Sequence, residues 1–345
     1  MGLYDRRVRK IHGARTLKAS ECPVCDATEV RPRFTVEGIE PPVVVCTTCG
    51  LGRFFPMLGT EEVNRFYPSE YYGPLGAKFR APVEWLVRVV AARHIAFLSR
   101  GLLPGAQVLD VGCGRGVLCS ALADRGFRVN GVEMSEEAVK GTDTRAEVRI
   151  APKLSDAAYA ACSFDQVILW HVLEHLPDPF ATLEECHRIL RPGGRLIVAV
   201  PNFSSLQARA SGPAWFHLDA PRHLYHFPLS ALRRLIERCG FRCGPAHHFS
   251  LRQNPFGWIQ SALNRFSSQR PNQLYTFLQR AGQGDSRRAD GATWLRMWLL
   301  LTLATPAACA LSVLEAILRS GATVHVLATR RHDGGAVDAN RSNER

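Results

Sequence analysis

Short hydrophobic runs alternate with helical segments through the middle of the chain. Residues 108–111 (VLDV) form an apolar run, followed by a glycine-rich turn and a segment of helical periodicity that stops at Gly126. Further apolar runs lie at 127–133, 164–170 and 194–202, with a helical pattern between the last two. Strands that alternate with helices predict an α/β protein with a doubly wound parallel sheet. Ligands of such sheets bind at the carboxyl ends of the strands.

The turn after the first strand indicates the kind of cofactor. It reads D-x-G-x-G-x-G, with Asp110 directly before Gly112, Cys113 and Gly114. A dinucleotide-binding turn has the spacing G-x-G-x-x-G and places a pyrophosphate at a helix N-terminus. A carboxylate at position 110 would repel a phosphate, whereas it suits a cationic amino-acid group. The turn therefore favours a cofactor with an amino-acid part over NAD.

This turn and the order FDxV…LEHLPDP…LRPGGxLxxxVPN resemble the class I S-adenosylmethionine-dependent methyltransferases over about 95 residues from Val108. The resemblance implies a Rossmann-like seven-stranded sheet whose last two strands, here 240–250 and 321–330, form an antiparallel pair. It also implies that Glu133 accepts hydrogen bonds from both ribose hydroxyls of the cofactor. The full set of residues that the resemblance assigns to cofactor binding is Asp110, Gly112, Cys113, Gly114, Glu133, Met134 and Trp170.

The chain departs from many relatives after the third strand. Those relatives carry an acid there that contacts adenine, and the corresponding stretch, RIAPKLSDAAYAACSFD, offers only Asp156. A backbone contact near Leu154 is an equal alternative. We therefore include Asp156 as a cofactor-binding residue on this resemblance alone.

Two histidines are candidates for the general base. His171 follows the fourth strand, beside the cofactor by resemblance, and His223 lies in the histidine-rich segment after the fifth strand. Methyl transfer is an in-line displacement, and histidine can remove an acceptor proton near neutral pH. Either side chain could instead bond backbone or loop carboxylates, and a metal site in this segment stays open. The pattern H-x-x-E-H at 171–175 also fits an inverted zinc-protease motif, but the proline-rich residues 177–179 cut off the long helix that it needs.

Two CxxC pairs near the N-terminus predict a metal site. Cys22, Cys25, Cys46 and Cys49 have the spacing C-x2-C-x20-C-x2-C, which is typical of a structural Zn–S4 site of the zinc-ribbon type. The β-rich residues 33–45 between them could supply the strands of the ribbon. Unmetallated turns and a redox pair are the alternatives. A ribbon with a basic N-terminus also leaves nucleic-acid binding open as a less favoured function.

A hydrophobic stretch near the C-terminus raises the question of a membrane. Between Arg296 and Glu315 there are 18 residues without a charge, interrupted by Pro306. The stretch belongs to a predicted helical insertion, 251–320, between the last two strands, and both ends of that insertion must return to one sheet. A single crossing is therefore excluded. Because Pro306 leaves halves of roughly ten residues, we predict a shallow helical hairpin in one leaflet. A dimer interface and a lid on the domain are the alternatives.

The charge and the cysteine content indicate where the protein is located and which partners it could bind. Lys and Arg number 43 against 31 acids, and the insertion holds eight Arg against three acids, a balance suited to anionic headgroups. The basic N-terminus has no apolar region of a signal peptide, and most of the 11 cysteines are scattered, as in a reducing compartment. We therefore expect a cytoplasmic protein on the inner face of a membrane. The oligomeric state stays open.

These observations combine into one prediction of organisation and function. We expect a basic N-terminus with a zinc ribbon (1–78), a class I methyltransferase domain (79–250) and a membrane-associating helical insertion (251–320). The last strand (321–331) and a disordered tail (332–345) complete the chain. The predicted activity is S-adenosylmethionine-dependent methyl transfer to a lipophilic or lipid-linked acceptor, with a soluble sugar nucleotide or other small metabolite as the alternative. A non-catalytic nucleic-acid-binding protein is the alternative of another class.

Overall fold

A computed structural model describes residues 6–13, 15–59, 62–63, 65–66, 93–140, 145–266, 271–282 and 291–331. The predicted boundary at 78/79 and the predicted disordered tail lie outside these residues.

A seven-stranded sheet forms the centre of the molecule, with the strand order β12-β13-β10-β9-β6-β7-β8. The strands β6 to β10 run parallel to one another, and β13 is antiparallel to both of its neighbours. This confirms the predicted doubly wound sheet with an antiparallel last pair. The strands are β6 (Gln107–Val111), β7 (Arg128–Glu133), β8 (Glu147–Ile150), β9 (Phe164–Trp170), β10 (Leu190–Pro201), β12 (Phe241–His247) and β13 (Thr323–Arg330).

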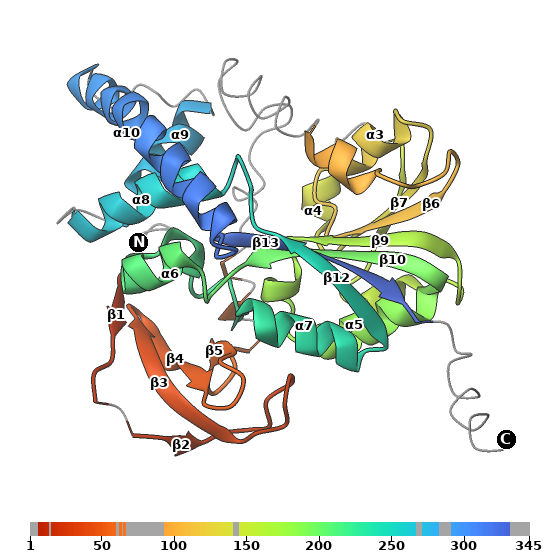
Figure 1. Cartoon of the computed structure of the whole chain (residues 1–345), viewed down its shortest axis with the longest axis horizontal. Coiled ribbons are helices and arrows are strands. Elements are labelled where there is room, and N and C mark those ends of the chain that lie inside the picture. Colours follow the sequence, from red (N-terminus) through yellow and green to blue (C-terminus); the bar gives the residue numbers. More distant parts are fainter. Residues whose placement is uncertain are drawn as a thin grey trace, which may run out of the picture.

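Helices cover both faces of this central sheet (Figure 1). One face carries α3 (Val117–Ala123) and α4 (Glu136–Val139), and the other carries α5 (Pro179–Ile189) and α7 (Leu229–Arg238). The helix α7 is amphipathic and buries Ala231, Leu232, Leu235 and Ile236 on one side. Short elements beyond the carboxyl ends of the strands are η2 (Leu154–Ala157), η3 (Leu173–His175), α6 (Leu206–Ser211), η4 (Gly212–Ala214) and η5 (Phe216–Leu218).

A second sheet of six strands, here called the ribbon sheet, contains the four CxxC cysteines. Five of its strands come from the N-terminus: β1 (Val8–Lys10), β2 (Leu17–Lys18), β3 (Glu29–Val36), β4 (Ile39–Cys46) and β5 (Gly52–Phe54). The sixth, β11 (Tyr225–His226), comes from the histidine-rich segment and pairs antiparallel with β5. The predicted strands of the ribbon are thus present, but the sheet is completed by a strand that lies between β10 and β12 in the sequence, the neighbours of β13 in the central sheet.

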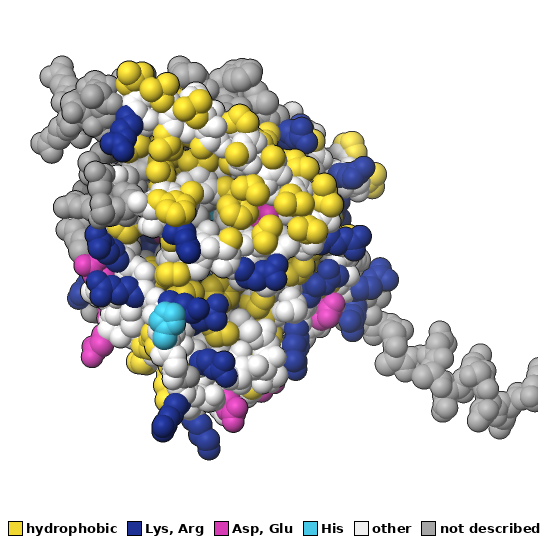
Figure 2. Space-filling view, turned by 60° about the vertical axis from the view of Figure 1, so that its left-hand side comes forward, with side chains coloured by type: hydrophobic (Ala, Val, Ile, Leu, Met, Phe, Trp, Pro, Cys, Tyr) yellow, Lys and Arg dark blue, Asp and Glu magenta, His cyan; other side chains and the backbone are white. Residues whose placement is uncertain are grey.

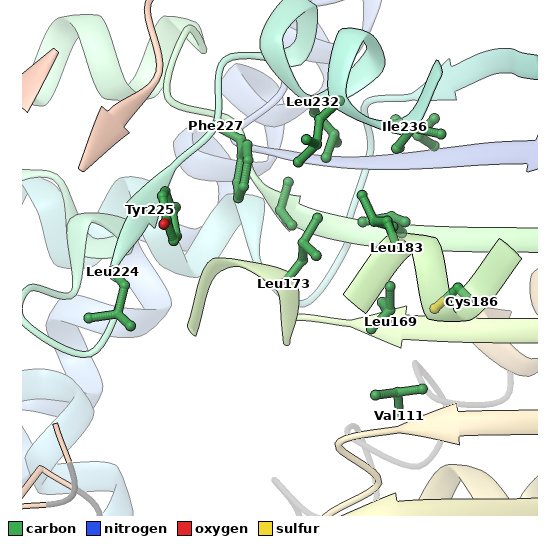
Figure 3. Close-up of a cluster of buried hydrophobic side chains, with 14 of the residues drawn as sticks. Val111, Leu169, Leu173, Leu183, Cys186, Leu224, Tyr225, Phe227, Leu232 and Ile236 are labelled. Atoms are coloured by element: carbon green, nitrogen blue, oxygen red, sulfur yellow. The ribbon is translucent and has the colours of Figure 1, made fainter. Parts of the chain in front are cut away.

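One hydrophobic core joins the two sheets. Figure 3 shows buried side chains that continue from Leu169 on β9, through Leu183 on α5 and Leu232 on α7, to Tyr225 on β11 and the neighbouring Phe227. The same core contains the buried cysteines Cys22 and Cys46 of the ribbon sheet. Because the apolar contact is continuous, the ribbon sheet is held against the central sheet by packing as well as by strand pairing.

The predicted insertion between the last two strands is helical. It contains α8 (Asn254–Phe266), α9 (Gln273–Gly282) and α10 (Gly291–Ile317), which lie together at one end of the molecule (Figure 1). They share a small core of their own, centred on Ile259, Leu274 and Ala308.

The predicted hairpin around Pro306 is wrong, because α10 continues through the proline as one helix. Proline removes one backbone donor and crowds the preceding turn, which kinks or breaks a helix. The carbonyl that Pro306 deprives of its donor is that of Thr302, four residues earlier. The helix continues because one side of it packs against the shared core of α8 and α9, through Leu300, Leu301 and Ala304.

A buried carboxylate anchors α10 to the rest of the protein. Glu315 accepts hydrogen bonds from the backbone N of Gln207 on α6 (3.0 Å) and from Nε1 of Trp258 on α8 (3.2 Å). Burial raises its pKa to about 7. Since a donor that loses its buried acceptor costs about 1–3 kcal/mol, this carboxylate fixes the C-terminal part of α10 against both helices.

Candidate active site and zinc site

The glycine turn after β6 has one closely packed side and one open side. Gly112 and Gly114 both have positive φ, 70° and 52°. A Cβ at Gly112 would come within 2.5 Å of Cγ2 of Val172, whereas a Cβ at Gly114 would meet nothing within 4 Å. The turn is thus packed against the residues that follow β9 and leaves open space at Gly114, where the backbone can approach a ligand.

The acid at the end of β7 faces this turn. Glu133 Oε2 accepts a hydrogen bond from the backbone N of Gly114 (2.9 Å), and Oε1 accepts from the backbone N of Met134 (2.9 Å) and of Ser135 (3.1 Å). These contacts use both lone pairs of Oε1 and one of Oε2, so they orient the group and leave one acceptor position, on Oε2, for a ribose hydroxyl. The side chain of Met134 is 51% exposed beside it and offers an apolar surface to an adenine ring.

Asp110 is buried beneath the turn, at the end of β6. Its Oδ2 lies 3.6 Å from Sγ of Cys119, and burial, with a smaller contribution from the charge of Glu133, raises its pKa to about 7. A cationic ligand group nearby would favour the charged carboxylate. Cys113 is buried against Gly131, where a Cβ would lie 2.7 Å from its sulfur. These residues therefore fit a cofactor with a cationic amino-acid part and a ribose.

Two of the proposed cofactor residues have less direct support. Asp156 is exposed on η2 and accepts hydrogen bonds from Lys153 N (3.2 Å) and Ser155 Oγ (3.4 Å). This position follows β8, as expected for an adenine contact, but the assignment stays a prediction. Trp170, at the carboxyl end of β9, packs against the rings of His94 and His325, with centroids 5.1 and 4.6 Å apart.

His171 has the geometry of a positioned base. It has a left-handed backbone, with φ of 55°, which non-glycine residues adopt mostly at constrained sites. Its Nδ1 lies 3.2 Å from Oε1 of the buried Glu174. Its Nε2 is buried and has no hydrogen-bond partner in the part of the chain that the structure describes. When Nδ1 donates to Glu174, Nε2 carries a free lone pair that can accept a proton.

Neutral aromatic rings from three elements surround His171, and the sequence did not predict them. His94 comes from the helical segment 93–98, and His325 lies on β13, in register with Ala199 and, through it, with Trp170. Burial lowers the pKa of His94 to about 4 and that of His217 to about 3, and it also lowers the pKa of His325. These imidazoles are therefore uncharged at neutral pH, and they suit an acceptor with an apolar or aromatic part.

His223 lies deeper than His171, and a backbone carbonyl occupies its Nδ1. Its Nδ1 is 2.9 Å from the carbonyl of His217, its Nε2 is 3.7 Å from Oδ2 of Asp219, and burial lowers its pKa well below the usual value. Its ring packs edge-on against His175, with centroids 4.6 Å apart. These contacts favour His171 as the base and give His223 a role in the interior.

A second group of ligand atoms adjoins His171. Glu174, His175 and His223 each place one ligand atom within 4.8 Å of the others, so they could hold a divalent cation. Glu174 and His175 come from the H-x-x-E-H motif, which here forms only the 3-10 turn η3 and not the long helix of a zinc protease. From the sequence, a metal site in the histidine-rich segment was a possibility, but this combination of ligands was not predicted. His223 reaches the other two residues because the strand β11 that follows it pairs with β5.

The four N-terminal cysteines form a preorganised metal site. Their sulfurs all lie within 4.8 Å of one another, with 3.6 Å between Cys22 and Cys49 and 3.6 Å between Cys25 and Cys46. Zn–S bonds of about 2.3 Å in a tetrahedron place sulfurs about 3.8 Å apart. Hydrogen bonding from Cys49 lowers the pKa of Cys22 to about 5, which favours a thiolate. The site therefore fits zinc, with no position left for a substrate.

The zinc site is connected to the candidate active site through the ribbon sheet. His226 on β11 pairs with Gly52 on β5, where an added Cβ would lie 2.9 Å from Cβ of His226. Asp26, in the first CxxC turn, accepts from both terminal nitrogens of Arg238 on α7, 3.1 Å away. The ribbon sheet thus holds the chain directly after His223.

Comparison with known proteins agrees with this geometry. Residues 84–244 match a protein family described as "Methyltransferase domain". The "Ubiquinone biosynthesis O-methyltransferase" of Xanthomonas campestris pv. campestris is 38% identical over 111 residues, which are 30% of this chain and 46% of that protein. The protein of the same name from Xylella fastidiosa is 39% identical over 152 residues, 41% of this chain and 59% of that protein. The chain thus spans about half the length of the curated relatives it matches.

Solved structures of similar proteins are more distant in sequence. A SAM-dependent methyltransferase from Archaeoglobus fulgidus is 18% identical, with a TM-score of 0.45, over 71% of this chain and 93% of that one.

The raised pKa of Asp110 predicts pH-dependent cofactor binding. Because a cationic group of the cofactor favours the ionised carboxylate, binding releases a proton below pH 7, and affinity falls as the pH decreases from about 7 to about 5.5. The affinity should fall by at most about tenfold per pH unit. Titration calorimetry with S-adenosylmethionine measures it. Asp110→Asn should bind more weakly and lose this slope, whereas Asp156→Asn should keep it; a slope unchanged in Asp110→Asn would contradict the assignment.

Loss of the zinc site should reduce the rate of methyl transfer and leave cofactor binding intact. Cys25→Ser/Cys46→Ser should abolish bound zinc, measured by metal analysis, and release β11 from its fixed position. A displacement of about 1 Å at an active site can cost about 10²-fold in rate, so transfer should fall by roughly this factor. Affinity for S-adenosylmethionine should persist, because Asp110 and Glu133 lie on the other sheet. The exposed Cys162→Ser is the control, and equal loss of both properties would argue for general unfolding.

Proposed function

We propose that this chain, whose central domain is a class I S-adenosylmethionine-dependent methyltransferase domain, methylates a hydroxyl oxygen of a lipophilic acceptor at a membrane surface. The observation that carries the proposal is the position of His171. Its free Nε2 lies at the carboxyl end of β9, and the paired acids Asp110 and Glu133 lie at the ends of the neighbouring strands β6 and β7.

The chain's own side chains would divide the work as follows. The cofactor, when bound, supplies an electrophilic methyl group. Glu133 and Asp110 bind and orient it, and the open side of the turn at Gly114 lets it approach the backbone. His171 Nε2 accepts the proton of the acceptor hydroxyl as the oxygen attacks, and Glu174 holds the imidazole and stabilises its charged form. Glu174, His175 and His223 could also hold a divalent cation, which would supply further electrostatic stabilisation beside the imidazole.

Two observations support a lipophilic acceptor. The curated relatives that match are named for ubiquinone biosynthesis. The walls around His171 are Trp170 and the neutral rings of His94 and His325. An apolar, ring-bearing acceptor gains more from such walls than a highly charged sugar nucleotide does, because the site offers few charges to compensate a buried phosphate.

A membrane surface is supported by the exposed side of α10. Residues Leu295–Ile317 are long and apolar enough to cross a bilayer, and only 11% of their most apolar window is buried. The core helix of a soluble protein would be mostly buried. Exposed apolar side chains recur along α10 at spacings of three, four or eight positions: Leu295, Leu299, Leu303, Leu311, Leu314 and Ile317. Burying each half-exposed side chain in lipid would contribute about 1 kcal/mol.

The packing of α10 favours a helix that lies on the membrane. Its other side, with Leu300, Leu301 and Ala304, contacts the shared core of α8 and α9. A helix that crossed the bilayer would take these partners into the lipid with it. Figure 2 shows hydrophobic side chains gathered over this end of the molecule, bordered by Lys and Arg with few acids. An apolar face with a basic border suits an anionic interface.

The proposed activity is tested by incubating the zinc-loaded protein with methyl-labelled S-adenosylmethionine and a total lipid extract. We expect label in the lipid fraction and loss of about 10²–10⁴-fold of the rate in His171→Ala, which removes the proposed base. Binding of the cofactor should be retained in this variant. His12→Ala, an exposed histidine of the N-terminal segment, is the control. Label confined to water-soluble products would instead favour a soluble acceptor, and no label in either fraction would contradict the enzyme.

The membrane contact is tested by flotation with lipid vesicles. In Leu303→Ser/Ile317→Ser, two side chains that are 78% and 73% exposed on α10 become polar. We expect at least about tenfold weaker association, since each loses roughly 1 kcal/mol or more of apolar transfer free energy. The matched control is Leu17→Ser/Leu103→Ser, two exposed leucines outside the insertion. Equal effects of the two pairs, or a wild-type protein that does not float, would contradict membrane contact.

A further inference from the structure

A cavity of about 360 Å³ lies apart from the candidate active site. It is enclosed by the N-terminal strand β1 with the residues before it, by residues 211–220, and by the end of α8 with Pro271 and Asn272. It shares no residue with the glycine turn, the acids that bind the cofactor, or His171. Neither methyl transfer nor the zinc site accounts for it.

The border of the cavity is strongly basic. Arg6, Arg7, Arg9 and Arg265 line it, and the acid that lines it is Asp219. Both carboxylate oxygens of Asp219 already accept hydrogen bonds from Nη2 of Arg222, so its charge is compensated. The cavity therefore has a clear excess of guanidinium groups, and arginine suits phosphate because its fork of donors matches the oxygens.

One of these guanidinium groups has an unused donor. Arg6 donates from Nη1 to the carbonyl of Glu37 (2.8 Å) and lies over the ring of Phe66, 5.0 Å from its centroid. These contacts fix the side chain. Its Nε is buried and has no hydrogen-bond partner among the residues that the structure describes. A buried charged donor left unpaired is costly, and an anion in the cavity would provide a partner.

The inner wall of the cavity is apolar and held in place. Trp215 is buried and donates from Nε1 to Oε1 of Gln207 (3.0 Å), while Phe216 is half-buried beside it. The ring of Phe216 packs edge-on against Phe256 on α8 and lies close to Tyr275 on α9, with centroids 5.2 and 5.6 Å apart. The cavity thus joins a basic border to an apolar wall that continues into the insertion.

We propose that this cavity binds the phosphate headgroup of an amphiphile, with the phosphate at Arg6, Arg9 and Arg265 and the adjoining apolar part against Trp215 and Phe216. Such a ligand is a phospholipid of the membrane or the phosphate of a lipid-linked acceptor. In either case it is held by the segment that contains His217 and leads to His223. The site goes beyond the proposed methyl transfer, and its phosphate binding is measurable whether or not the transfer occurs.

The test uses the full-length, zinc-loaded protein and the variant Arg9→Gln/Arg265→Gln. These two side chains are exposed, so the variant removes charge without removing core contacts. The control Arg128→Gln/Arg242→Gln changes the same charge at exposed positions of β7 and β12, in the central sheet. Inorganic pyrophosphate is titrated by calorimetry, and vesicles of phosphatidylcholine with and without phosphatidylglycerol are used for flotation. Circular dichroism and bound zinc verify that each protein is folded.

We expect the cavity variant to bind pyrophosphate about tenfold more weakly than both wild type and control, the effect of losing about 1.4 kcal/mol of charge-assisted contact. A parallel loss of binding to phosphatidylglycerol vesicles would identify a membrane phospholipid as the source of the phosphate. Loss of pyrophosphate binding alone would identify the acceptor's phosphate. Equal weakening in the control, or no pyrophosphate binding by wild type, would overturn the proposal.

Discussion

The pairing of β5 with β11 is the contact on which the arrangement of the molecule depends. It requires a glycine at position 52, because the backbone of β5 lies against His226 so closely that a Cβ would come within 2.9 Å. The pairing joins the sheet that contains the four-cysteine site to the segment 217–226, which includes both His217 and His223. Zinc held by these cysteines would therefore stabilise more than the ribbon: it would fix one wall of the candidate active site from about 170 residues away in sequence.

The central sheet was predictable because its signals are local. Apolar runs, the glycine turn and the acids at 110 and 133 are each contained in one strand or one turn, and the predicted seven-stranded sheet with its antiparallel last pair is confirmed. The path of α10 was not predictable in the same way. Pro306 is a local signal for a break, but the helix is maintained by its packing on α8 and α9. Tertiary contacts outweighed the local preference.

The candidate site shows the same division. His171 was predicted because it directly follows a strand, whereas His94 and His325 come from a segment before the sheet and from its last strand. Their proximity depends on the register in which His325 faces Ala199 and Trp170. The alternation of side chains along β13 could have indicated which face of the sheet His325 occupies. No sequence pattern gives the register in which β13 pairs with β10. The grouping of Glu174 and His175 with His223 likewise depends on β11.

The exposed apolar side of α10 and its fixed attachment to the rest of the protein determine how the proposed acceptor can be oriented. Glu315 fixes the end of α10 to α6 and α8, so the exposed apolar side of α10 cannot turn independently of the central sheet. The segment 215–219 lies between the basic cavity on one side and the rings around His171 on the other, since it contributes Trp215 to the cavity and His217 to those rings. A headgroup held in the cavity would therefore act on the same short segment that bounds the acceptor site. The same segment leads into β11, which pairs with β5, so its position is fixed at both ends. A site that binds an amphiphile in one orientation needs walls with fixed positions.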